Sequence, residues 1–182
     1  PFFSQSWTPL ALNESDIGLA GVKRIEHGAF RYGLPLPIGE AKLAPDSSFY
    51  TAIANTPFLD DYTGLLAEEI LTAESLGKDE NTDFLGISFS ATDLIGHRYG
   101  PESFEILDNV LRLDATIQHL FMTIEQNVGL NNTLVIFSSD HGVQALPEAQ
   151  RKSLGGHSRL ATDDIKCIQG SLNSRPDVRL ML

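Results

Sequence analysis

Residues 83–103 read DFLGISFSATDLIGHRYGPES, and residues 133–142 read TLVIFSSDHG. Each stretch opens with a short apolar run that has the length of a buried strand. Amphipathic helix patterns alternate with these two runs along the chain. Continuous apolar strands that alternate with helices are typical of a parallel sheet covered by helices. The sequence therefore predicts an α/β fold with central strands at 83–90 and 133–139.

The two predicted helices have recognisable ends. The first begins at Asp60 or Asp61, either of which can cap it, and it ends at Gly77. The second begins at Pro101, carries apolar residues at helical spacing and ends at Gly129. Their order along the chain is helix, strand, helix, strand.

An acidic residue and a histidine follow each predicted strand. Asp93 and His97 lie just beyond the first, and Asp140 and His141 end the second. Ligands of open α/β sheets bind beyond the carboxyl ends of the strands, so both pairs can face one crevice. Asp93 and His97 are four residues apart, which places them on one side of a helix. Carboxylate and imidazole groups suit zinc or another divalent metal, and two such ions can clamp the oxygens of a phosphoryl transfer.

Size and charge narrow the classes of function. The 182 residues can form one good core, and no stretch approaches the roughly 20 apolar residues of a membrane span. The net charge of −11 argues against nucleic-acid binding, which needs clusters of Lys and Arg. The single cysteine, Cys167, excludes a disulfide within the chain. We therefore expect no nucleic-acid partner and no membrane association.

The first 50 residues show no sustained period and are rich in glycine, proline and aromatic residues. We interpret residues 1–50 as part of an irregular cap or insertion and residues 51–182 as part of a metal-binding α/β core. The chain opens at Pro1 without an initiator methionine, so it reads as a mature or excised fragment.

Three sequence motifs resemble those of a known family: TPFLDDYTGLLAEEIL, GHRYGPES and SSDHG. Over about residues 50–147 the chain resembles the alkaline phosphatase superfamily. It is most similar to the branch of monomeric phosphate-irrepressible bacterial alkaline phosphatases and nucleotide pyrophosphatase/phosphodiesterases. The resemblance implies a fragment of a three-layer α/β/α sandwich from a zinc-dependent phosphomonoesterase or phosphodiesterase. It also implies a small phosphoester substrate and a periplasmic or secreted location.

The resemblance implies roles for the four site residues. Asp93 and His97 would bind one zinc with a histidine further downstream, and Asp140 and His141 would bind a second. An upstream aspartate and a threonine or serine nucleophile would complete that second site. No residue of this chain matches the nucleophile, so we expect the chain alone to be inactive.

Two further residues are additional candidates. His157, flanked by glycines in SLGGHSRL, could reach the crevice as a substitute ligand. Asp114 interrupts an apolar helix face and either hydrogen-bonds a ligand histidine or sits at the edge of that face.

Two alternatives remain open at this point. The chain could be a non-catalytic fragment that binds a metal or a partner without turnover. It could instead belong to a sulfatase or phosphonate hydrolase of the same superfamily, because the residues that would select the substrate would lie upstream.

Overall fold

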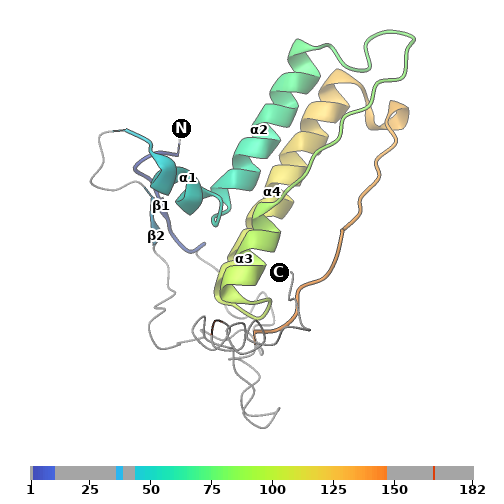
Figure 1. Ribbon diagram of the computed structural model, residues 1–182. Coiled ribbons are helices and arrows are strands. Elements are labelled where there is room, and N and C mark those ends of the chain that lie inside the picture. The colour runs from blue at the N-terminus through green and yellow to red at the C-terminus, as the bar shows by residue number, and fades with distance from the viewer. Residues whose placement is uncertain (1, 11–35, 39–43, 147–165, 167–182) are drawn as a thin grey trace, which may run out of the picture. The chain divides into compact units, whose positions relative to one another are not determined.

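The computed structural model describes residues 2–10, 36–38, 44–146 and 166 (Figure 1). The chain divides into two compact units, residues 1–145 and 146–182, and all of the following elements belong to the first. They are the strands β1 (Ser6–Trp7) and β2 (Leu36–Pro37), the helices α1 (Ser47–Ile53), α2 (Phe58–Ala73), α3 (Ala91–Tyr99) and α4 (Phe104–Asn127), and the 3-10 turn η1 (Leu130–Asn132).

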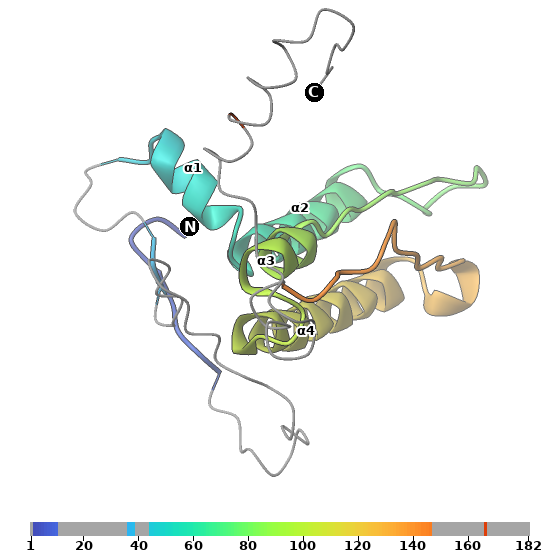
Figure 2. The same ribbon diagram turned by 60° about the horizontal axis from the view of Figure 1, so that its bottom comes forward.

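Helices α2 and α4 lie side by side and run in the same direction, and α3 packs against both (Figures 1 and 2). The close approach of α2 and α4 depends on Gly64, where an added Cβ would lie 2.4 Å from Cγ2 of Thr116. The Thr116 hydroxyl also donates a hydrogen bond to Asp61 Oδ1 at 2.9 Å. A glycine and a small polar pair therefore fix the contact between the two long helices.

The helix predictions are confirmed apart from their ends. Helix α2 starts at Phe58, so Asp60 lies inside its first turn and does not cap it. The cap of α4 is Ser103, whose hydroxyl accepts a hydrogen bond from the Ile106 N–H at 3.2 Å. Gly77 and Gly129 follow their helices with positive φ, which glycine adopts without steric cost.

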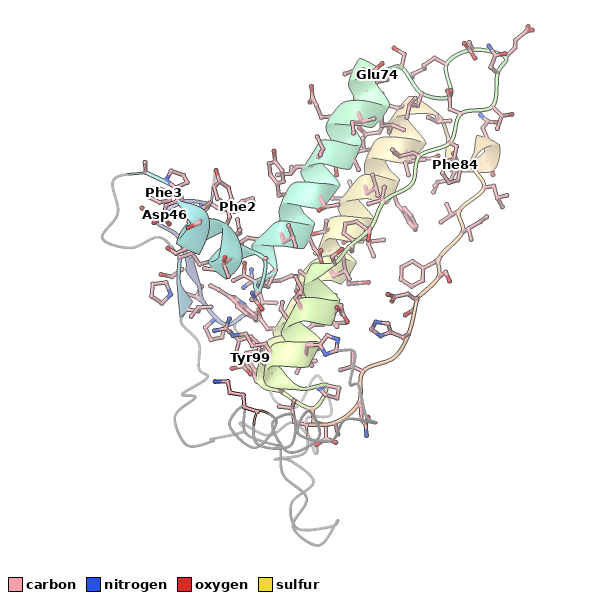
Figure 3. All side chains as sticks on the ribbon, in the orientation of Figure 1. Phe2, Phe3, Asp46, Glu74, Phe84 and Tyr99 are labelled. Atoms are coloured by element: carbon pink, nitrogen blue, oxygen red, sulfur yellow. The ribbon has the colours of Figure 1, made fainter. Side chains whose placement is uncertain are left out.

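The structure does not bear out the two predicted central strands. Residues 83–90 and 133–139 are extended, and both segments run opposite in direction to α2 and α4 (Figure 1), but neither forms a strand. A strand requires a ladder of hydrogen bonds to a neighbour, and among the described residues only β1 and β2 pair, antiparallel. Phe84 (labelled in Figure 3) is 91% exposed and Leu134 is 86% exposed, so the apolar faces of both runs are uncovered.

An apolar core joins the described N-terminal residues to α1, α2 and α3. Trp7 of β1 is fully buried and meets the ring of Tyr99 edge-on at 6.1 Å. Phe2 stacks on Phe58 at 5.1 Å. Helix α1, which the sequence analysis did not predict, adds Phe49 to this core, and its cap is Asp46. The predicted division of the chain at residue 50 stays a prediction.

Asp108 ties the N-terminal segment to α4. Its carboxylate is fully buried and accepts hydrogen bonds from Trp7 Nε1 at 2.7 Å, the Leu10 N–H at 2.6 Å and Arg112 Nε at 2.7 Å. The Arg112 guanidinium also donates to the Thr8 carbonyl oxygen at 2.8 Å. Since both carboxylate oxygens are satisfied, this buried charge is compensated.

None of the helices that the structure describes combines the length and the apolar content of a membrane span.

The Asp108 network predicts a large stability loss in Asp108→Ala. The substitution leaves the Trp7 indole N–H, the Leu10 N–H and the Arg112 guanidinium without their acceptor, and breaking a buried charged network costs about 3–5 kcal/mol. Urea unfolding would measure it, with the exposed Asp79→Ala as the matched control. A loss below about 1 kcal/mol, the value of an exposed ion pair, would contradict this account of the N-terminal segment.

Candidate metal centre

Helix α3 presents the first pair of candidate ligands. Asp93 lies in its first turn and His97 in its last turn. Their spacing of four residues brings Nε2 of His97 to 3.2 Å from Oδ1 of Asp93. The predicted placement of both side chains on one side of a helix is therefore what the structure shows.

The second pair lies on the extended segment after η1. Nε2 of His141 is 3.7 Å from Asp93 Oδ1 and 3.5 Å from Asp140 Oδ2. The rings of His97 and His141 have their centres 6.2 Å apart. One ligand atom from each of Asp93, His97 and His141 lies within 4.8 Å of the others, and we call these three residues the metal cluster. Asp140 borders the cluster through His141.

A packing contact holds the His141 segment against α3. Val143 lies over Gly96, where an added Cβ would be 3.1 Å and 3.3 Å from its two methyl carbons. Gly96 adjoins His97 in sequence, and Val143 follows His141 by two residues. The absence of a side chain at Gly96 thus lets the two halves of the metal cluster approach each other.

The chemistry of the metal cluster fits a divalent cation. Oδ1 of Asp93 is shielded from solvent and accepts no hydrogen bond from the described part of the chain. Two imidazole nitrogens face this oxygen, His97 Nε2 at 3.2 Å and His141 Nε2 at 3.7 Å, so either a protonated ring or a shared cation would satisfy it. One oxygen and two imidazole nitrogens are the ligand types of a catalytic zinc, which keeps a further position open.

His141 is held in the tautomer that a metal ligand needs. Its Nδ1–H donates to the Gly142 carbonyl oxygen at 2.9 Å, which leaves Nε2 directed at Asp93. This hydrogen bond, followed by the charges of Asp140 and Asp93, raises the pKa of His141 above its ordinary value of 6.5, while loss of solvent acts in the opposite direction. Protons therefore compete with a cation for this nitrogen at mildly acidic pH.

The other candidates lie elsewhere. Asp114 lies on the exposed face of α4, in a shallow hollow beside Ile117 and Phe121, and it is not part of the metal cluster. His119 is also on α4, where its Nδ1 lies 2.8 Å from Glu68 Oε1. His157 falls outside the described residues.

Two buried polar residues near the metal cluster were not predicted. Asp60 of α2 and Asn109 of α4 both contact the first turn of α3. Asp60 was assigned to a helix cap, and Asn109 lies on the helix that the apolar spacing alone defined. The sequence offers one signal for Asp60 and Asn109: each is a polar residue on the side of an amphipathic helix that faces the core.

The Val143 contact predicts that Gly96→Leu separates the two halves of the metal cluster. The added side chain would push Val143, and His141 with it, away from α3. Nuclear Overhauser cross-peaks between the ring protons of His97 and His141 should weaken or vanish. Gly142→Ala is the matched control, because its Cβ would meet nothing within 4 Å. Unchanged cross-peaks in Gly96→Leu would contradict this role of the contact.

The charge environment predicts that Asp140→Asn lowers the pKa of His141. The substitution removes one of the two carboxylates that stabilise the imidazolium. An NMR titration of the His141 Cε1–H would measure the change, and Asp114→Asn should leave the titration curve as it is. An unchanged or higher pKa in Asp140→Asn would show that the Asp140 charge does not act on the ring.

The chain is similar in sequence to known alkaline phosphatases. The alkaline phosphatase PhoV of Synechococcus elongatus is 36% identical over 107 residues, which cover 59% of this chain and 20% of that protein. The alkaline phosphatase PafA of Elizabethkingia meningoseptica is 39% identical over 90 residues, which cover 50% of this chain and 16% of that protein. The chain therefore spans about a fifth or less of the length of these two relatives.

The fold agrees as well. The crystal structure of wild-type alkaline phosphatase PafA matches 93% of this chain with a TM-score of 0.69 and 25% sequence identity, over 32% of its own length. This match confirms the predicted α/β class and the resemblance to the alkaline phosphatase superfamily. Residues 30–172 match the model of a family of hydrolases described as type I phosphodiesterase / nucleotide pyrophosphatase. The chain belongs to the type I phosphodiesterase/nucleotide pyrophosphatase family of the alkaline phosphatase superfamily.

Proposed function

We propose that this chain provides part of the two-zinc centre of a phosphoester hydrolase. Asp93 and His97 bind one ion, and Asp140 and His141 bind the second. The observation that carries the proposal is the convergence of ligand atoms from Asp93, His97 and His141 within 4.8 Å. The residues come from two segments more than 40 positions apart in the sequence, so no local turn explains their approach.

The distances support chelation within each pair. Nε2 of His97 lies 3.2 Å from Oδ1 of Asp93, and Nε2 of His141 lies 3.5 Å from Oδ2 of Asp140. Two ligand atoms that bind one tetrahedral zinc at about 2.0–2.2 Å lie roughly 3.4 Å apart. Each pair can therefore chelate its own ion, and two ions about 3.5–4 Å apart would both reach one phosphoryl group.

The chain's own residues orient this centre. Bound zinc polarises a phosphoryl oxygen and lowers the pKa of an oxygen nucleophile. The Gly142 carbonyl fixes the His141 tautomer, so that Nε2 is a lone-pair donor once the ring is neutral. Asp93 offers an oxygen that no hydrogen bond occupies. When the pH is above the pKa of His141, these groups can bind a cation without first losing a proton.

The proposed substrate is a small phosphoester. The relatives reported above are named alkaline phosphatases, and the family model names a phosphodiesterase. The net charge of −11 would repel an anionic substrate, so the bound cations supply the local positive charge that attracts the phosphate. The periplasmic or secreted location that the resemblance implies stays part of this proposal.

The proposal predicts that zinc creates a phosphate site. Calorimetric titration should show zinc binding to the chain at pH 8, and the zinc-loaded chain should then bind inorganic phosphate, which the zinc-free chain should not. His141→Ala should weaken zinc binding by at least about tenfold, since loss of even a residue that supports a metal ligand costs 10- to 100-fold. Phosphate affinity should fall with it.

His119→Ala is the matched control, because this histidine pairs with Glu68 on the two long helices and lies outside the metal cluster. It should bind zinc and phosphate as the wild-type chain does. Equal zinc affinity in wild type and His141→Ala, or loss of affinity in His119→Ala alone, would contradict the proposed centre.

A further inference from the structure

The first turn of α3 is held by a buried carboxylate of α2. Asp60 is 1% exposed, and its Oδ1 accepts a hydrogen bond from the Ala91 N–H at 3.0 Å. Ala91 is the first residue of α3, and Asp93 follows two positions later. A negative group at a helix N-terminus is favourable because the free N–H groups and the helix dipole point toward it.

A second buried side chain holds the same turn from α4. Asn109 is fully buried, and its Nδ2 donates to the hydroxyl of Thr92 at 2.9 Å. The two residues that precede Asp93 are thus each fixed by a polar side chain from a different helix. Two such contacts on adjacent residues define both the position and the rotation of a short helix.

We propose that Asp60 and Asn109 are positioning residues for the metal centre, which set the place of Asp93 and His97 relative to His141. The inference rests on the proposed function and extends it, because neither residue is a metal ligand. Helix α3 has only nine residues, so a small rotation of its first turn moves both ligand side chains together.

The burial of both side chains supports a positional role. Oδ1 of Asn109 is buried and accepts no hydrogen bond from the residues that the structure describes. An unsatisfied buried oxygen destabilises a fold, so an apolar side chain of similar volume would be more favourable for packing alone. Burial also disfavours the charged form of Asp60. Packing alone therefore does not explain these two polar side chains, whereas their contacts with Ala91 and Thr92 of α3 do.

The ionisation of Asp60 can be followed separately from the metal. Burial raises its pKa to about 6, the Asp61 charge adds to this effect, and the N–H groups of Ala91, Thr92 and Ser90 oppose it. In the described part of the chain, the charged group that acts on the Asp60 carboxylate is Asp61 of the same helix. Helix α3 and its N-cap contribute neutral backbone N–H groups. Since the folded pKa is raised, the contribution of Asp60 to stability is lost as the pH rises through about 6.

Two substitutions at position 60 separate positioning from simple packing. Asp60→Leu keeps most of the volume but removes the acceptor for the Ala91 N–H, whereas Asp60→Asn keeps an acceptor without the charge. Zinc affinity of the full 182-residue chain should fall about 10- to 100-fold in Asp60→Leu. It should stay within about threefold of wild type in Asp60→Asn, whose melting temperature should rise more at pH 8 than at pH 5, because the stability loss of the wild-type chain develops between pH 3.8 and about 6.

The Ala91 amide provides a readout that needs no metal. Its proton shift should titrate with a midpoint near pH 6 in the wild-type chain, and this step should be absent from Asp60→Asn. The ring cross-peaks between His97 and His141 should weaken in Asp60→Leu. Asn109→Leu, which acts on the same turn from α4, should weaken both these cross-peaks and zinc binding, and it serves as the second variant if Asp60→Leu does not fold.

Asp114→Leu is the control. This carboxylate is exposed on α4 and lies outside the metal cluster, so its loss should leave zinc affinity and the ring cross-peaks near wild type. Equal zinc affinity in Asp60→Leu and Asp114→Leu, or unchanged ring cross-peaks in both Asp60→Leu and Asn109→Leu, would overturn the proposal. If the wild-type chain bound no zinc, the proposed function would fail, while the cross-peaks of Asp60→Leu and Asn109→Leu would still decide the positioning role.

Discussion

The hydrogen bond from the Ala91 N–H to the buried carboxylate of Asp60 is the contact on which the geometry of the candidate site depends. It fixes the start of α3 on α2, while Asn109 fixes the next residue on α4. Because α2 and α4 are themselves locked together at Gly64 and Thr116, α3 is placed on a rigid pair of helices. The ligand side chains of α3 inherit that placement, which is the preorganisation that a metal site requires.

The sequence predicts the two long helices well because their signals are local. Apolar spacing defines α4, and Gly129, with positive φ, directly follows its C-cap. Helix α2 ends four residues before Gly77, and Ser75 is the residue of positive φ that follows its C-cap. The strands could not be predicted in the same way, because a strand exists only through a partner, and an apolar run such as 133–139 shows no more than a suitability for burial. The role of Asp60 could not be predicted for the same reason. A carboxylate near the start of a helix can cap that helix or accept a hydrogen bond from a neighbouring helix, and tertiary packing decides between the two.

The metal cluster was more predictable than the packing that assembles it. Residue type and spacing single out Asp93 with His97, and Asp140 with His141, because closely spaced carboxylate and imidazole groups are typical ligands of zinc. The contact between Val143 and Gly96 brings His141 close to the ligands on α3, and no sequence pattern predicts this contact. Family membership then gives these residues a chemical context, since the matched relatives are phosphatases and phosphodiesterases.

The central claim is that two adjacent zinc ions bind at this site, one at Asp93 and His97 and the other at Asp140 and His141. A crystal structure of the chain grown with zinc, with anomalous scattering measured at the zinc absorption edge, tests it most directly. The account predicts an anomalous peak about 2.0–2.2 Å from Asp93 Oδ1 and from a ring nitrogen of His97, with a second peak beside His141 and Asp140. Zinc bound at His119 or at other surface groups, with no peak beside Asp93 and His141, would contradict it.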